Sequence, residues 1–228
     1  MSPASQARDR RTSVDDIFDH LYGAIASLSL RPGDKISEAE VAAEFGVSRQ
    51  PVRDAFSRLA NDNLLLIRPQ RATEVRRFSM REIEKARFVR AAVEAEVLRR
   101  AAGEAGPDGT ARLRRCLEEQ ADAIAAGDYG LFGQLDYAFH DAICEVAGVA
   151  FASEVIRGEK AKVDRLCILS LAKEDRMPQL LDDHRRIVTA IEAGDPLRAV
   201  EIGMIHLSRL DETIGAIAAS NADYFDPD

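Results

Sequence analysis

The sequence predicts a mainly α protein with an N-terminal winged helix-turn-helix and a C-terminal all-helical bundle of six to seven helices. Three observations predict this architecture. A capped helix, a glycine turn and a second capped helix lie near residue 50, and two short apolar runs with a basic tip follow them. Helical periodicity then continues almost to the end of the chain. A length of 228 residues with 46% hydrophobic residues allows two modest domains with real cores.

Turn residues and charge suggest the domain boundaries. We expect a flexible arm at 1–12, the winged helix-turn-helix at 13–78, the helical domain at 79–220 and a frayed tail at 221–228. The first 78 residues carry 12 Lys/Arg against 11 Asp/Glu, whereas the remainder carries 19 against 28. The net charge of −8 therefore comes from the helical domain, and it does not argue against contact between the first domain and DNA.

Composition also predicts the compartment. The three cysteines, Cys116, Cys144 and Cys167, are odd in number and widely spaced, so they predict neither a disulfide framework nor a cysteine zinc site. No apolar run approaches the roughly 20 residues of a membrane span, and the polar N-terminus lacks the apolar core of a signal peptide. We expect a cytoplasmic protein without membrane contact.

The first domain carries clear helix signals. Ser13 can cap a helix from about Val14 to Ser27. Ser37 and Glu40 form a capping box, and the helix that they open is expected to stop near Gly46. Ser48 can cap the next helix, which is expected to run to about Asn61 with Pro51 in its first turn.

Arginines at the start of that second helix suggest contact with the DNA major groove. Arg49 and Arg53 lie four residues apart and share a face, and arginine can bond guanine in a bidentate manner. A solvated helix face is the alternative interpretation. The apolar runs at 64–67 and 73–75 predict two strands that form a wing with a basic tip. The candidate DNA-binding residues are Ser48, Arg49, Gln50, Arg53, Arg68, Gln70 and Arg71.

The second domain is expected to be helical throughout. A second capping box at Ser79–Glu82 opens it, and glycines and an Asp195-Pro196 pair mark the turns. The expected helices span about 80–103, 111–126, 129–147, 151–172, 177–193 and 196–219.

Three of the four histidines, His140, His184 and His206, fall in three different expected helices. Asp136 precedes His140 by four residues, so both project from one helix face. One carboxylate and three imidazoles are good ligands for a divalent first-row metal, and the ion would keep positions open for water or an anion. The metal and Asp136 would sum to about +1, which a carboxylate effector would neutralise. Histidines with ordinary structural roles are the alternative.

The first domain resembles the winged helix-turn-helix of the GntR family of bacterial regulators. The resemblance rests on Leu30–Asp34, Ile36–Glu38, Phe45–Ala55 and the wing at Arg68–Arg71. It implies that Arg49 and Arg53 contact the operator, with Gln50 nearby. Two positions depart from the pattern. Ala39 stands where some members carry a DNA-contacting arginine, and Ala72 stands where the wing often has glycine.

Residues 79–219 resemble the all-helical ligand-binding domain, called FCD, of the FadR-type branch. The matching motifs are Phe88–Glu94, Asp136–His140, His184–Ile187, Ala190–Asp195 and His206-Leu207. In metal-binding members of this branch, one Asp and three His hold the ion, which implies Asp136, His140, His184 and His206 here. Zinc, nickel and manganese are all compatible. The resemblance also implies that Arg90 helps to bind the effector's carboxylate, with an ion pair to Glu94 as the alternative.

Together these observations predict a homodimeric transcription regulator of the GntR family, most simply a repressor. Two recognition helices would read a palindromic operator on double-stranded DNA. A small carboxylate effector at the metal would change operator affinity. Two other interpretations stay open, a metal-dependent hydrolase-like enzyme and a metal-free helical interaction module.

Overall fold

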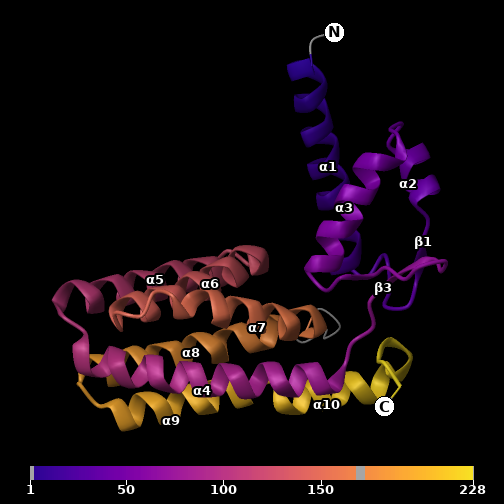
Figure 1. Ribbon diagram of the computed structural model, residues 1–228. Helices are drawn as coiled ribbons and strands as arrows, with labels where there is room; N and C mark the ends of the chain where they lie inside the picture. Colours follow the sequence, from indigo (N-terminus) through magenta and orange to yellow (C-terminus); the bar gives the residue numbers. More distant parts are fainter. Residues whose placement is uncertain (1–2, 168–172, 228) are drawn as a thin grey trace. The chain divides into compact units, whose positions relative to one another are not determined.

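The computed structural model describes residues 3–167 and 173–227, and they form two compact units. The first unit contains residues up to Met80 together with the C-terminal segment from Ser220, and the second contains Arg81–Ala219. Figure 1 shows a small sheet and three helices in the first unit and a helical bundle in the second. The predicted fold class, a winged helix-turn-helix followed by a helical bundle, is confirmed.

The first unit is built on three helices and a three-stranded antiparallel sheet. The helices are α1 (Pro3–Ala26), α2 (Glu38–Glu44) and α3 (Arg49–Asn61), and the strands are β1 (Lys35–Ile36), β2 (Leu65–Leu66) and β3 (Thr73–Val75). The sheet order is β1-β3-β2, with Lys35 opposite Glu74 and Leu65 opposite Val75. Strand β1 was not predicted, because two residues carry no readable alternation.

Buried apolar side chains hold the helices of the first unit together. Ile17, Leu21 and Ile25 of α1 face Val52 and Phe56 of α3 in one cluster, and all five are at most 3% exposed. Within each helix they are spaced by four residues, as in the apolar stripe of a helix that covers a core. The opposite face of α3 is thereby left for Arg49 and Arg53, which are exposed.

Helix caps explain where α2 and α3 begin and end. The Ser37 hydroxyl accepts a hydrogen bond from the Glu40 amide at 3.4 Å, and Gly46 has a φ of +63° just after α2. Ser48 occupies the N-cap of α3, but its side chain makes no cap hydrogen bond, which corrects the expectation that its hydroxyl caps the helix. Ser37 therefore fixes the start of α2, and the tight turn between α2 and α3 rests on Gly46.

Substitutions at two glycines are expected to have opposite effects on stability. Gly46→Ala should lower the free energy of unfolding by about 1 kcal/mol, because a positive φ strains a residue that carries Cβ, although nothing lies within 4 Å of that atom. Gly23→Ala should raise it by about 0.5–1 kcal/mol, because Gly23 lies inside helix α1 with open space around its Cβ position. Urea denaturation of the full-length variants measures both effects, and equal effects would contradict the backbone argument.

In the wing turn, the residue with positive φ is not at position 72, where GntR regulators often carry glycine. Gln70 adopts a φ of +59°, and the Arg71 amide donates to the Arg68 carbonyl at 3.3 Å. Pro69 thus precedes the left-handed residue, as in a type II turn, in which position i+2 needs positive φ. The strained position is Gln70, and alanine at 72 is compatible with the turn.

The chain's last residues pack in the first unit, which corrects the expectation of a frayed tail. The Phe78 amide donates to the Tyr224 carbonyl at 2.8 Å, and the Asp226 amide donates to the Phe78 carbonyl at 2.7 Å. The Phe78 and Phe225 rings lie 5.5 Å apart. Phe78 is 4% exposed, so the pairing covers an apolar side chain that follows the wing.

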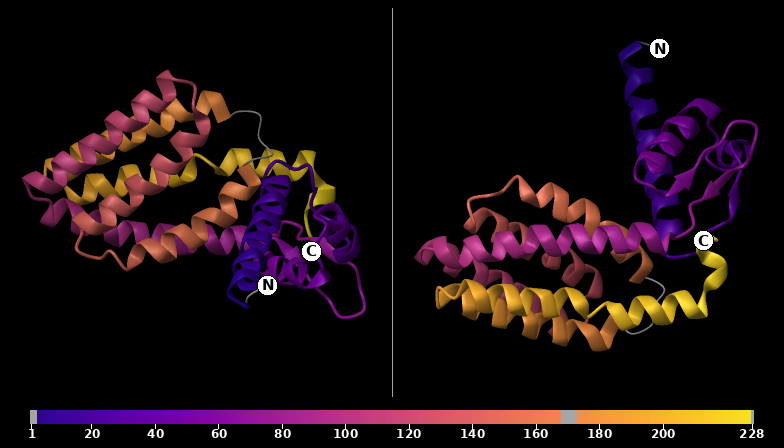
Figure 2. Two further views of the ribbon diagram at one scale, coloured as in Figure 1. Left: turned by 90° about the horizontal axis from the view of Figure 1, so that it is seen from above. Right: turned by 60° about the horizontal axis from the view of Figure 1, so that its bottom comes forward.

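The second unit is a helical bundle around one apolar core. Its helices are α4 (Met80–Glu104), α5 (Pro107–Ala125), α6 (Tyr129–Val146), α7 (Ala152–Cys167), α8 (Lys173–Glu192), α9 (Pro196–Ser208) and α10 (Asp211–Ser220). Six of them, α4 to α9, contribute buried side chains to the main cluster, with Phe139 and Leu113 fully buried. Figures 1 and 2 show α9 and α10 following one another along α4. An ion pair between Arg87 and Asp211 joins α4 to α10.

Four expected helix boundaries were wrong. Helix α1 begins at Pro3, because 4–12 contain good helix formers such as Ala, Gln and Arg, where a flexible arm was expected. Helix α5 begins at Pro107, a favoured first helical residue, so Gly109 lies inside it. Helix α8 begins at Lys173 and includes Pro178.

The fourth wrong boundary is the break after α9, where one helix over 196–219 was expected. Helix α9 ends at Ser208, whose hydroxyl donates to the Ile205 carbonyl as at many helix ends, and α10 begins at Asp211. Because of this break, the described residues of the bundle form seven helices, the upper end of the expected six to seven. Part of the helix expected at 151–172, residues 168–172, lies outside the described residues.

Candidate functional site

The candidate recognition surface of the first unit is the exposed N-terminal half of α3. Ser48, Arg49 and Gln50 are exposed around the first turn, where free backbone amides and the positive helix end favour a phosphate. Arg53 follows one turn later on the same face. The structure thus places the four helix residues that the sequence singled out on one accessible surface.

Acidic neighbours hold several of these basic side chains. Arg53 Nε lies 2.9 Å from Glu38 of α2, and Gln50 Nε2 donates to Asp54 at 2.9 Å. At the wing, Arg68 lies 3.0 Å from Glu74 of β3. The two arginine ion pairs and the Gln50 hydrogen bond lie at the surface and contribute little stability, so exchange of the carboxylate for a phosphate or a base has a small penalty. Gln70 and Arg71 are exposed at the wing tip.

Three histidines from three helices of the bundle converge in its interior. One ring nitrogen each of His140 (α6), His184 (α8) and His206 (α9) lies within 4.8 Å of the others. All three side chains are at most 7% exposed. Nitrogens that share an ion at about 2.1 Å lie roughly 3 Å apart, so small side-chain adjustments would bring these three around one ion.

Each of the three histidines has one buried ring nitrogen that makes no hydrogen bond with the described residues. His140 Nε2, His184 Nε2 and His206 Nδ1 are buried and have no hydrogen-bond partner among the described residues. A buried polar atom without a partner is costly, and it calls for an ion or a water in the site. The nitrogens without partners are therefore the main reason to regard the three histidines as suitable ligands for a divalent metal.

The second nitrogens of two histidines are held in place. His184 Nδ1 lies 2.8 Å from the amide oxygen of Gln120, and His140 Nδ1 lies 3.1 Å from a carboxylate oxygen of Glu94. Such outer contacts fix the tautomer and aim the other nitrogen at a metal. Gln120 could not be predicted from residue spacing, because it lies 64 residues from His184 and on a different helix.

Asp136 lies beside this cluster, on α6 one turn before His140. Its Oδ1 is 3.5 Å from His184 Nε2, and its Oδ2 is 2.9 Å from Lys160 Nζ. Of the four side chains for which the resemblance implied metal binding, the structure brings the three histidines together and places Asp136 beside His184. Lys160 of α7 is a neighbour that the sequence reasoning missed, although its spacing of four residues from Asp164 was visible as a charge pair.

Burial and charge set the protonation of the site. Burial lowers the pKa of His184 well below its ordinary value, and His206 lowers it further, so His184 is neutral and offers a lone pair. Burial alone would raise the pKa of Asp136, but the charge of Lys160 holds it far below its ordinary range. For Glu94, His140 and Arg90 outweigh burial and lower the pKa to about 2. Both carboxylates are therefore ionised at neutral pH.

Arg90 makes the local ion pair that the sequence offered as an alternative. Its Nε lies 2.8 Å from Glu94 Oε1, and both side chains are 6% exposed. Glu94 thus joins Arg90 to His140. Arg90 would reach an effector only by sharing or releasing this carboxylate.

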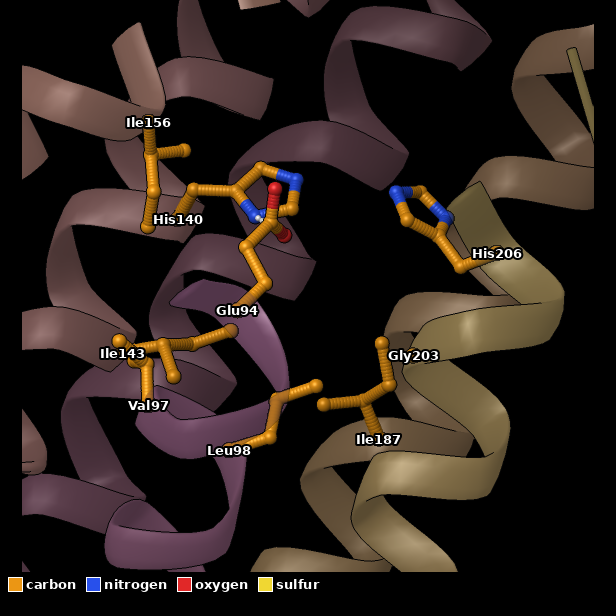
Figure 3. Close-up of a pocket in the computed structure, with 9 residues that line it drawn as sticks. All are labelled: Glu94, Val97, Leu98, His140, Ile143, Ile156, Ile187, Gly203 and His206. Carbon is orange, nitrogen blue, oxygen red and sulfur yellow. Dashed lines mark ion pairs between the residues drawn. The ribbon is translucent and has the colours of Figure 1, made fainter. Parts of the chain in front are cut away.

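A small pocket opens next to the histidines. Figure 3 shows His140, Glu94 and His206 around it, with Leu98 and Ile187 pointing toward each other on another side. The lining residues are Glu94, Val97, Leu98, His140, Ile143, Ile156, Ile187, Gly203 and His206. Gly203 lets α9 approach α4, because a Cβ there would lie 2.2 Å from Leu98 Cδ1. The pocket therefore joins the polar histidine cluster to an aliphatic wall.

Comparison with known proteins identifies the family. Residues 13–75 match the family described as bacterial regulatory proteins, gntR family, and residues 86–209 match the FCD domain. The chain is 34% identical over 226 residues to the HTH-type transcriptional repressor RspR of Escherichia coli, covering 99% of both chains. It is 30% identical to a probable D-xylose utilization operon transcriptional repressor of Paenarthrobacter nicotinovorans, covering 86% of each.

A solved structure shares the fold. A putative GntR transcriptional regulator from Rhodococcus sp. RHA1 matches with a TM-score of 0.68 and 22% identity, covering 90% of this chain and 98% of that one. The fold and the two domain matches define a DNA-binding transcription regulator with a helical FCD domain. This chain belongs to the GntR family and to its FCD branch.

Family membership decides against the enzyme interpretation. The relatives are named as transcriptional regulators, and the histidine site lies in a domain that is joined to a DNA-binding head. Among the described residues, no helix combines the length and the apolar run that crossing a membrane requires.

Proposed function

We propose that this protein is a homodimeric, cytoplasmic repressor whose operator affinity is controlled by a small organic acid bound at a metal in the helical domain. The three buried, unpartnered histidine nitrogens carry the proposal. Zinc, nickel and manganese all suit a site of three imidazoles and one carboxylate. Two relatives are named as repressors, which supports repression rather than activation.

In this proposal the residues of the two units have separate tasks. His140, His184, His206 and Asp136 hold the ion, which would supply a Lewis-acidic position for a carboxylate. Arg90 takes part in holding that carboxylate through its guanidinium. Arg49, Arg53 and Gln50 read base edges of a palindromic operator, and Ser48, Arg68, Gln70 and Arg71 contact its backbone or minor groove.

Release from DNA requires that the acid bind the two states of the protein with different affinity. The test begins with an operator selected from random duplexes by the metal-loaded protein. Fluorescence anisotropy then follows operator binding in the presence of mono- and dicarboxylic acids. We expect at least one acid to weaken binding about tenfold or more, in line with typical coupling energies, and to be recovered unchanged.

Two comparison proteins test whether the response to the acid depends on the metal site. Chelator-stripped protein and His140→Ala should bind the operator and lose the response to the acid. The proposal is wrong if metal-loaded and stripped proteins respond alike to every acid. A purified wild type without metal would instead favour the metal-free helical module.

A further inference from the structure

Lys160 is a buried cation beside the histidine cluster. It is 7% exposed, and its Nζ lies 2.9 Å from Asp136 Oδ2 and 4.0 Å from the centre of the Tyr137 ring. It also forms an ion pair with Asp164, whose carboxylate accepts a hydrogen bond from the Tyr137 hydroxyl at 2.7 Å. A lysine is rarely buried unless it is paired, and here one of its partners belongs to the candidate metal site.

The two oxygens of Asp136 face different groups. Oδ2 faces Lys160, whereas Oδ1 lies 3.5 Å from His184 Nε2, one of the three unpartnered nitrogens. A carboxylate that is already neutralised by an ammonium group attracts a second cation less strongly. The ammonium also repels a divalent ion in the interior, where screening is weak.

We propose that Lys160 is a built-in counter-cation that weakens divalent-metal binding at the Asp136 and histidine site and so sets the metal concentration at which the site fills. This inference rests on the metal site of the proposed function. The geometry supports this counter-cation role, because Lys160 contacts Oδ2 of Asp136 while Oδ1 faces His184. The competing explanation is that Lys160 only joins α6 and α7 through Asp136, Asp164 and Tyr137.

Zinc affinity of the full-length protein distinguishes these explanations. Zinc is titrated, in competition with a chromogenic chelator, into three chelator-stripped proteins: wild type, Lys160→Met and Lys160→Arg. Methionine keeps much of the side-chain length without the charge, and arginine keeps the charge. We expect Lys160→Met to bind zinc at least about tenfold more tightly than wild type and Lys160→Arg to stay within about threefold.

Lys162→Met is the matched control. Lys162 lies two residues away on α7 and pairs with Glu159 at 2.7 Å, so its removal should leave zinc affinity unchanged. Thermal unfolding gives a second measurement. Without its lysine, Asp136 is a buried unpaired carboxylate, so zinc should raise the unfolding temperature of Lys160→Met more than that of wild type.

Each outcome has a separate meaning. Equal or weaker zinc binding by folded Lys160→Met overturns the counter-cation role and leaves the metal site standing. Should Lys160→Met fold poorly, Lys160→Gln repeats the comparison, and equal or weaker binding there has the same consequence. Zinc binding by neither wild type nor variant refutes the metal site itself.

Discussion

His184→Ala is expected to reduce the affinity of the protein for zinc by at least about 100-fold and to remove metal from the purified protein. His184 is the most enclosed of the three histidines, at 0% exposed. Its Nε2 lies 3.5 Å from Asp136 Oδ1, and its ring centre lies 5.8 Å from that of His140 and 4.7 Å from that of His206. Its loss removes one of the four candidate ligands and the contact to Gln120. Elemental analysis after gentle purification, followed by zinc titration, measures the effect.

Two further variants separate the loss of a metal ligand from a loss of stability. His184 stacks on Phe139 with ring centres 4.3 Å apart, so alanine leaves a cavity that could also destabilise the bundle. His206→Gln removes a ligand with less change in volume and should show the same loss of metal. His20→Ala is the control, because His20 is the fourth histidine of the chain and lies exposed in the first unit. Metal content that is undiminished in His184→Ala would contradict the assignment.

Arg49→Ala and Arg53→Ala are each expected to weaken specific operator binding by about 1–3 kcal/mol, or roughly 5- to 150-fold. Both side chains are exposed on the face of α3 opposite its packed apolar stripe. The effect of Arg53→Ala should be the smaller by a few tenths of a kcal/mol, because Arg53 must leave Glu38 to reach DNA. Anisotropy titrations at fixed salt measure both affinities.

The controls for this prediction separate base contacts from general charge. Arg115→Ala removes an exposed arginine from the bundle and should leave operator affinity unchanged. Neither recognition-helix variant should change metal content or oligomeric state. The recognition-helix assignment would fail if both variants bound the operator as wild type does, or if they weakened specific and random DNA equally, since phosphate contacts alone have the latter effect.

Local sequence signals predicted helix α3 well. The Ser37 cap, the glycine at 46 and the apolar stripe of α3 act within a few residues, so they can be read without knowledge of the fold. The Arg90–Glu94 pair is local in the same sense. The break near residue 209 and strand β1 lie beyond such signals, because two-residue features carry no periodicity.

The histidine cluster depends on packing between helices. Residue spacing indicated that Asp136 and His140 share a face, but it could not bring His184 and His206 to the same place without the family resemblance. Gln120 and Lys160 were missed because each meets its site partner across helices. The charge balance expected from the metal and Asp136 alone was therefore incomplete, since it omitted the ammonium group next to that carboxylate.

Anomalous X-ray diffraction from zinc-loaded crystals tests the central claim most directly. The account predicts one anomalous peak per chain inside the bundle, within about 2.3 Å of a ring nitrogen each of His140, His184 and His206 and of an oxygen of Asp136. Data measured above and below the zinc edge identify the element. A peak elsewhere on the protein, or no peak among these four side chains at full zinc loading, would contradict the account.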